Sequence, residues 1–319
     1  MNGASRFVAA SAVWFFASTG CEWKYGGHEG TGGGIPPWGL TETYVIVDLS
    51  TGGVTEASAI ADLETNDAYK TTKLVLKRIP AGTFQMGDQV GGHENDELPV
   101  HTVSITRPFY MGVFEVTQEQ WTTIVGSWTF YFPGNPQRPA EQISWNDIKQ
   151  SGGFMDTLSS RASMSFRLPT EAEWEYCCKA GTSTNYSFGD TADGAWMWSN
   201  SNSESRTHDV ATTASKPNPW GLYDMHGNLY EWCEDWYDGG YYSYAPTNDP
   251  QGPASITPYG CHRVLRGGSW RHDDNDCRSA VRAYVDPSSR HSRRIGFRVA
   301  VAAAGHNRGA PFPVSRPRP

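Results

Sequence analysis

The sequence predicts a single α+β domain with little regular secondary structure. Glycine and proline, which interrupt helices and strands, occur 34 and 20 times in 319 residues. Aromatic residues make up 13 % of the chain, which supplies enough apolar surface for a packed core and argues against an unfolded protein. Clear helix start signals occur only twice, and the other apolar residues form short runs typical of strands.

The expected strands are short and precede the helices. The run Tyr44–Val47 is the first candidate. Leu74–Leu76 and Ile79–Phe84 predict a strand, a turn and a second strand, because Pro80-Ala81-Gly82 favours a turn between two apolar runs. Val100–Ile105 and Phe109–Phe114 are the next candidates.

Two capping boxes mark the expected helices. Thr117 is followed three residues later by Gln120, and Thr170 is followed three residues later by Glu173. In this pattern the two side chains satisfy each other's backbone N–H groups at the helix start. We expect the second helix to end at Gly181, where glycine adopts the left-handed conformation of a helix stop.

The first 21 residues predict export and lipid attachment. Arg6 precedes an apolar stretch, Phe7–Ala17, which is too short to span a bilayer and is typical of a signal peptide over residues 1–20. Ser18-Thr19-Gly20 then leads to Cys21, as in a lipobox whose cysteine receives the lipid. We therefore expect an exported protein that is lipid-anchored at the bacterial cell surface. An ordinary signal peptide with an incidental cysteine is the alternative.

The remaining chain divides into three expected parts. Residues 21–72 contain the lipid-anchor site, a Gly-rich tether over 26–39 and an N-terminal extension. The main domain is expected over residues 73–302, and residues 303–319 form a Pro- and Arg-rich flexible tail. The later cysteines are odd in number, so their pairing stays open, and mostly buried thiols are the favoured interpretation; they are Cys177, Cys178, Cys233, Cys261 and Cys277.

Six sequence blocks, in this order, resemble the formylglycine-generating enzyme (sulfatase-modifying factor) family across about residues 75–302. The resemblance implies a C-type-lectin-like fold of the formylglycine-generating-enzyme type, which also has little regular secondary structure. The blocks are Ile79–Gly87, Phe114–Thr117, Arg167–Tyr176, Gly221–Asn228 continued by Glu231-Trp232, Arg266–Trp270 and Gly296–Arg298.

The same resemblance argues against the family's chemistry in this chain. Enzymatic members oxidise a substrate cysteine with copper held by two cysteines five residues apart, and the matching positions here are His272 and Cys277. A soft Cu(I) site requires thiolates, and only one is present. The partners of the family's disulfides are also replaced, by Arg282 and Val299. We expect no enzymatic activity and no required cofactor; a copper-dependent oxidase that uses Cys277 is the alternative.

Structural calcium is a further implication of the resemblance. The matching ligands are the carbonyl groups of His226, Gly227 and Leu229 and the carboxylate of Glu231, all hard oxygen donors. The alternative is that Glu231 accepts hydrogen bonds from local groups without metal. A second family calcium site expects an acid where Thr213 stands, and we do not predict that site.

Residues 263–298 alternate motif residues with fifteen polar or small positions, named here the variable set. Every residue type in the set can be reached from an asparagine codon by replacing its two adenines, whereas Lys, Glu, Gln, Met and Trp cannot and are missing. This composition indicates adenine-directed mutagenesis by a diversity-generating retroelement, and the chain resembles the variable surface lipoproteins of such elements. The set is Arg271, His272, Asp273, Asp274, Asn275, Asp276, Val281, Tyr284, Val285, Asp286, Ser288, Ser289, His291, Ser292 and Arg293.

These observations predict a monomeric binding protein whose variable set contacts the ligand. The net charge of 26 − 34 = −8 excludes a general nucleic-acid binder, although residues 263–298 carry nine Arg and four Asp. Aspartates interleaved with the arginines disfavour nucleic acid there too. A protein ligand is favoured over a small molecule, which usually requires a concave apolar pocket. A loop face that is merely solvated is the alternative.

Overall fold

The computed structural model describes residues 43–303 except residues 92–93, 213–215, 256–259 and 291. The expected signal peptide, Cys21, the Gly-rich tether and nearly all of the tail lie outside the described residues, as do His291 and Thr213. Within the described part of the chain, no helix is long and apolar enough to cross a membrane.

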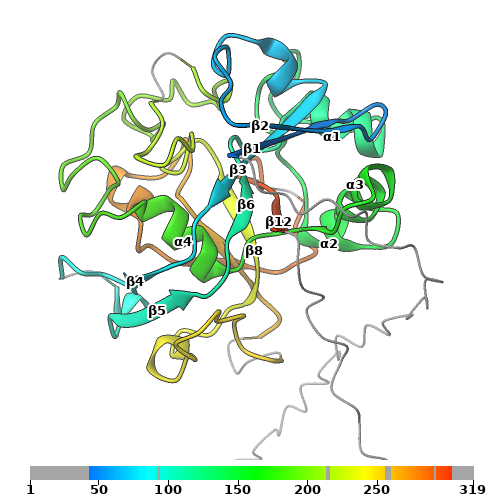
Figure 1. Cartoon of the computed structure of the whole chain (residues 1–319). Coiled ribbons are helices and arrows are strands. Elements are labelled where there is room, and N and C mark those ends of the chain that lie inside the picture. Colours follow the sequence, from blue (N-terminus) through cyan, green and yellow to red (C-terminus); the bar gives the residue numbers. More distant parts are fainter. Residues whose placement is uncertain (1–42, 92–93, 213–215, 256–259, 291, 304–319) are drawn as a thin grey trace, which may run out of the picture. The chain divides into compact units, whose positions relative to one another are not determined.

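The largest sheet contains six antiparallel strands in the order β2-β1-β3-β6-β12-β7 (Figure 1). Strand β12, from the C-terminal end of the domain, lies between β6 and β7 and therefore ties the two ends of the domain together. The strands are β1 (Tyr44–Asp48), β2 (Val54–Ala57), β3 (Lys73–Ile79), β6 (Phe109–Gly112), β7 (Phe166–Arg167) and β12 (Ala300–Ala302).

The domain begins before Lys73, which corrects the expected boundary. Strand β1 pairs along its whole length with β3, and its Val45 and Val47 side chains are fully buried. The strand expected at Tyr44–Val47 is confirmed, but it belongs to the main sheet and not to a separate extension. The physical reason is the alternation of buried valines, which gives β1 one face in the core.

Two smaller sheets complete the β structure. One has the order β10-β9-β8-β11, in which β8 and β11 are parallel, and the other pairs β4 with β5. The strand-turn-strand predicted near Pro80 and the strand predicted at Val100–Ile105 are confirmed as the end of β3, β4 and β5. The bounds are β4 (Gly82–Met86), β5 (His101–Ile105), β8 (Tyr230–Trp236), β9 (Arg263–Arg266), β10 (Ala283–Val285) and β11 (Ile295–Gly296).

Four α-helices occur in the described residues, two more than the start signals predict. Both predicted capping boxes are present, at Thr117 before α1 (Gln118–Val125) and at Thr170 before α4 (Glu171–Lys179). The sequence interpretation missed α2 (Trp145–Lys149) and α3 (Phe154–Ala162). Short 3-10 helices are η1 (Asp67–Lys70), η2 (Asn95–Glu97), η3 (Tyr241–Ser243) and η4 (Asp274–Cys277).

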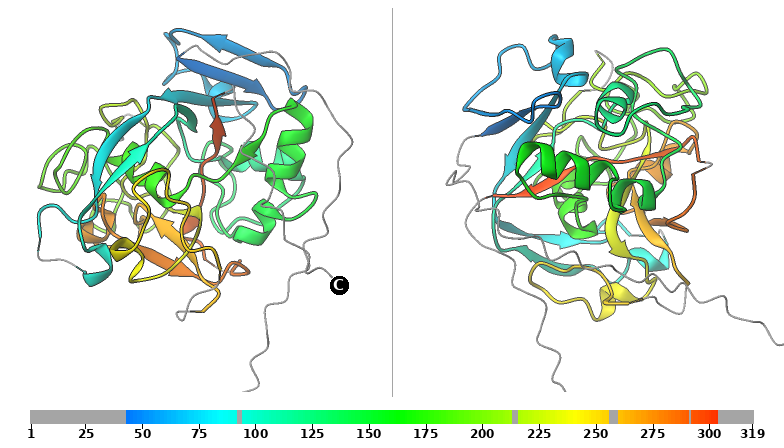
Figure 2. Two further views of the ribbon diagram at one scale, coloured as in Figure 1. Left: turned by 60° about the horizontal axis from the view of Figure 1, so that its bottom comes forward. Right: turned by 90° about the vertical axis from the view of Figure 1, so that its right-hand side faces the viewer.

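The helices lie on different sides of β6 and β12. Figure 1 shows α2 and α3 on the right of these strands and α4 on the left, and the turned view in Figure 2 places the helical group in front of β12. Trp121 of α1 stacks on Phe154 of α3 with ring centroids 5.4 Å apart, and Phe297 meets both rings edge-on. The residues just before β12 are therefore anchored in an aromatic core.

The cysteines are mostly buried, as expected. Cys177, Cys178, Cys233 and Cys277 are free thiols with no exposed surface, and Cys261 is partly exposed. Burial raises the pKa of Cys178 to about 12, so its sulfur is a protonated thiol at neutral pH.

Buried arginine–glutamate pairs connect the C-terminal segment to the rest of the domain. Arg298 is fully buried and donates to both carboxylate oxygens of Glu231, each at 2.6 Å. Its guanidinium also donates to the carbonyls of Gly112 (3.1 Å) and Tyr223 (2.9 Å). These bonds fix Arg298, two residues before β12, against the distant segments that contain Gly112, Tyr223 and Glu231.

Arg266, Arg278 and Arg282 also pair with buried glutamates. These pairs, together with Arg298 and Glu231, form what we name the arginine network. Burial alone would raise the pKa of Glu175, but the charges of Lys179 and Arg266 lower it, so Glu175 is ionised. The other pairs are Arg266 with Glu171 and Glu175, Arg278 with Glu97, and Arg282 with Glu171.

We predict that Arg298→Gln lowers the free energy of unfolding by about 3–5 kcal/mol, because it leaves the carboxylate of Glu231 buried without its counter-charge. Urea unfolding followed by tryptophan fluorescence measures the change. Arg206→Gln is the matched control, since Arg206 is exposed and its ion-pair partner among the described residues, Glu204, is exposed too. The control is expected to stay within about 0.5 kcal/mol of wild type. A loss below about 1 kcal/mol for Arg298→Gln would contradict the structural role of the network.

Candidate ligand-binding surface

Burial separates most motif residues of segment 263–298 from the variable set. The motif residues Arg266–Trp270, Cys277–Ala280, Arg282 and Ile295–Arg298 are buried, whereas Pro287 is partly exposed and Arg290 is exposed. Every described member of the variable set except Val281 is at least partly exposed. Val281 is 8 % exposed, so the prediction that it contacts a ligand is corrected: its side chain is held inside the domain.

The larger of two concave regions, about 680 Å³ in volume, is built on the four-stranded sheet. Its floor receives one residue from each strand: Tyr230 of β8, Leu265 of β9, Ala283 of β10 and Ile295 of β11. The strand pairing places these side chains on one face, because Leu265 is opposite Ala283 and Tyr230 is opposite Ile295. The variable set surrounds this floor through Arg271, His272, Tyr284, Val285, Ser289, Ser292 and Arg293.

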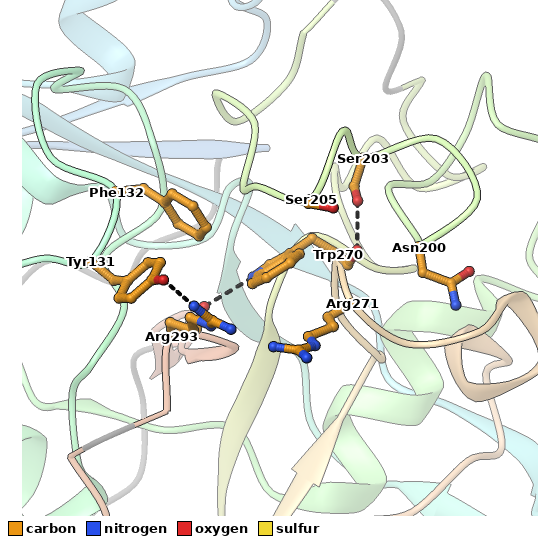
Figure 3. A pocket seen from close by; sticks show the side chains of 8 residues that line it. All are labelled: Tyr131, Phe132, Asn200, Ser203, Ser205, Trp270, Arg271 and Arg293. Carbon is orange, nitrogen blue, oxygen red and sulfur yellow. Dashed lines mark hydrogen bonds between the residues drawn. The ribbon is translucent and has the colours of Figure 1, made fainter.

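A smaller concave region of about 420 Å³ lies beside the first and shares Arg271 and Arg293 with it. Trp270, the last residue of the Arg266–Trp270 block, also lines it. The other lining residues come from distant segments, and the sequence interpretation missed them because each joins the region only through the tertiary fold. They are Tyr131, Phe132, Asn200, Ser203 and Ser205 (Figure 3).

Trp270 organises the smaller region. Its indole Nε1 donates to the carbonyl of Arg293 at 2.9 Å, and its own carbonyl accepts from Ser203 Oγ at 2.6 Å (Figure 3). The Arg293 guanidinium lies 4.4 Å from the centroid of the Tyr131 ring and donates to the Tyr131 hydroxyl. These contacts hold a variable arginine in place by means of residues outside the variable set.

His272 has both ring nitrogens engaged. The Arg294 guanidinium donates to Nε2 at 3.2 Å, so Nδ1 carries the proton and donates to Ser269 Oγ at 2.6 Å. Burial, followed by the charge of Arg294, lowers the pKa of His272, which favours this neutral form. The structure thus gives His272 a structural hydrogen-bonding role at the edge of the larger concave region.

Cys277 is enclosed by the protein. Burial raises the pKa of its thiol well above the usual range, and its sulfur packs so closely on Gly268 that a Cβ there would overlap it. The Cys277 carbonyl accepts from His226 Nδ1 at 2.8 Å, and His226 Nε2 in turn accepts from Ser187 N at 3.1 Å. Of the two matching positions only Cys277 supplies a sulfur ligand, and the imidazole of His272 is already engaged by Ser269 and Arg294, so the pair does not fit a Cu(I) site.

The expected calcium ligands do not fit calcium either. Glu231 has no exposed surface, and its two carboxylate oxygens receive Arg298 and the indole Nε1 of Trp174, the latter at 2.8 Å. Because a guanidinium already balances the Glu231 charge, the alternative of Glu231 bonded without metal describes the geometry better.

The chain matches the sulfatase-modifying factor enzyme 1-like domain over residues 60–303. The formylglycine-generating enzyme of Streptomyces coelicolor is 31 % identical over 290 residues, a match that covers 70 % of this chain and 88 % of that protein.

Two solved structures resemble the described fold. Treponema denticola variable protein 1 has a TM-score of 0.63 and 30 % identity, covering 72 % of this chain and 95 % of that one. PvdO from Pseudomonas aeruginosa has a TM-score of 0.62 and 28 % identity, covering 72 % and 94 %. The predicted C-type-lectin-like fold of the formylglycine-generating-enzyme type is confirmed. The chain belongs to the sulfatase-modifying factor enzyme 1-like domain family, which includes formylglycine-generating enzymes.

Proposed function

We propose that this protein is a non-enzymatic, surface-displayed binding protein whose variable set is diversified by a retroelement. The observation that carries the proposal is the separation of buried motif residues from exposed variable positions within one segment of the chain. Substitution at exposed positions changes the surface without opening the core, so one scaffold tolerates many sequences. The similarity to Treponema denticola variable protein 1 supports the same function.

The arginine network makes the proposed binding surface rigid. Arg266 and Arg282 hold the backbone on either side of the 271–276 loop through carboxylates of α4. A surface that is already ordered loses less conformational entropy on binding, which preserves affinity. Exposed Tyr284 and Arg271 are residue types that favour strong contacts at interfaces.

The absence of oxidase activity is part of the proposal. It is supported by the neutral, engaged imidazole of His272 and by the buried, protonated thiol of Cys277. Calcium is not part of the proposal, because Arg298 occupies the carboxylate that would bind it.

The proposed binding activity predicts the outcome of a selection experiment. In a library displayed on yeast, five exposed variable positions are encoded by asparagine codons in which each of the two adenines is replaced by any base. The positions are Arg271, Asn275, Tyr284, Asp286 and Ser288. We expect most clones to display folded protein and selection on immobilised hen lysozyme to yield binders, because substitutions outside the core leave packing intact.

The matched control library carries the same codons at five exposed positions remote from the concave regions: Thr55, Ser58, Ala59, Thr65 and Asp67. It is expected to fold and to yield no binders. Equal recovery from the two libraries, or loss of folded display in the first, would contradict the proposed binding surface.

Copper titration tests the non-enzymatic part of the proposal. We expect the wild-type protein to bind Cu(I) no more tightly than Cys277→Ala, because the Cys277 thiol is buried and protonated. Competition with a chromogenic Cu(I) chelator measures both affinities. Tight binding of one Cu(I) per wild-type chain that is lost in Cys277→Ala would restore the oxidase hypothesis.

Surface display is proposed from Cys21 and the preceding apolar stretch. In a bacterium with a lipoprotein-processing pathway, we expect wild-type protein in the membrane fraction and Cys21→Ser in the soluble fraction, since the serine variant lacks the thiol that receives the lipid. Immunoblotting of the separated fractions measures the distribution. Membrane association that is unchanged in Cys21→Ser would exclude a lipid anchor at this residue.

A further inference from the structure

The arginines of segment 263–298 form two groups with different partners. Arg266, Arg278, Arg282 and Arg298 pair with buried glutamates, and Arg290 pairs with Asp147. Arg263 lies between the rings of Trp145 (3.9 Å) and Trp236 (3.5 Å). The other three, Arg271, Arg293 and Arg294, line the concave regions. Between described residues, these three make no ion pair within 4 Å.

The aspartates of the variable set do not neutralise these three arginines. Asp273 accepts from Asn200, Asp274 accepts from Ser201 Oγ at 3.1 Å, and Asp286 accepts from the backbone N–H of Ser288 at 2.7 Å. The carboxylates of Asp273 and Asp274 therefore bond to the segment that contains Asn200 and Ser201, and that of Asp286 bonds within its own loop. Neither concave region has an acidic lining residue. Asp276 lies near His272, and its charge raises the pKa of the imidazole, whereas the charge of Arg294 lowers it.

Two of the three guanidinium groups are held in place. Arg293 rests on the Tyr131 ring, and Arg294 donates to neutral His272. Figure 3 shows Arg271 and Arg293 beside the Trp270 ring, where both concave regions meet. Preorganised guanidinium groups without a counter-charge are suited to bind carboxylates of a partner.

The surroundings of the arginines favour a polypeptide as the source of those carboxylates. The floor of the larger region is apolar apart from the Tyr230 hydroxyl. Tyr284, on β10 (Ala283–Val285) at one edge of the sheet, is 47 % exposed, and its ring stacks on Tyr237 with centroids 3.9 Å apart. An extended peptide that lies across the floor could contact these apolar residues and the arginines at the same time.

We propose that the two concave regions together bind an acidic polypeptide segment, with Arg271, Arg293 and Arg294 as the residues that recognise its carboxylates. This inference rests on the proposed binding function and specifies its ligand class. It also extends the contact surface beyond the variable set, to Arg294 and to the aromatic wall formed by Tyr131 and Trp270.

Fluorescence anisotropy with short labelled peptides tests the inference. The probes are a peptide of glutamate, serine and tyrosine and a matched peptide in which glutamine replaces glutamate, with an oligogalacturonate as an acidic glycan. At low ionic strength we expect the glutamate peptide to bind about tenfold more tightly than either other probe. We expect Arg271→Gln/Arg293→Gln/Arg294→Gln to remove that preference, since each exposed charge pair contributes up to about a factor of five.

The control Arg78→Gln/Arg107→Gln/Arg206→Gln removes the same charge from exposed positions outside both regions and is expected to retain wild-type binding. Equal loss in the two triple variants, or no binding of the glutamate peptide, would overturn the inference. Equal or tighter binding of the oligogalacturonate would overturn the polypeptide assignment. If the glutamate and glutamine peptides bind equally and Tyr284→Ala weakens both, the acidic ligand is excluded while the proposed binding surface stands.

Discussion

The pairing of buried arginines with buried glutamates is the constraint on which the rest of this structure depends. A buried charge is tolerated only when a counter-charge and hydrogen bonds surround it, so each pair fixes the relative positions of two chain segments. Arg266 and Arg282 connect the C-terminal segment to α4, Arg278 connects it to η2, and Arg298 connects it to β8. A domain with short strands and long loops thereby obtains a fixed backbone around its binding surface.

This arrangement explains how segment 263–298 can keep one backbone structure while its exposed residues change. The arginines that determine the backbone path point inward, and the variable side chains that face the concave regions contribute little to the core. Val281 shows the limit of the separation, because its position fits the codon pattern while its side chain is buried. His272 shows the chemical consequence, since its imidazole, at the position where the family resemblance predicts a copper ligand, bonds instead to Ser269 and Arg294.

Local signals predicted the parts of the fold that depend on local interactions. The capping boxes located α1 and α4, and apolar runs located β1, β4 and β5. Helix α2 also begins with a capping box, from Ser144 to Asp147, and a wider search for this pattern would have found it. Helix α3 has Gly153 at its N-cap position and no side-chain cap, so no such signal precedes it.

The candidate site was predictable only in part, for the same physical reason. The codon pattern identified most of the exposed positions, but Tyr131, Asn200 and Ser203 join the site through tertiary contacts that leave no local pattern. No sequence pattern indicated that the Glu231 charge is balanced by Arg298, a residue 67 positions away in the chain, which leaves that carboxylate poorly suited to calcium.

The sequence of the DNA around the gene tests the central claim most directly, that a retroelement varies these exposed positions on a fixed scaffold. The account predicts a nearby reverse transcriptase gene and a template repeat that matches the coding sequence of segment 263–298. Asparagine codons are expected in the template opposite the variable set, while the codons for Arg266, Arg278, Arg282 and Arg298 are the same in both copies. The absence of a template, or template differences spread equally over the buried arginines and the exposed positions, would contradict the account.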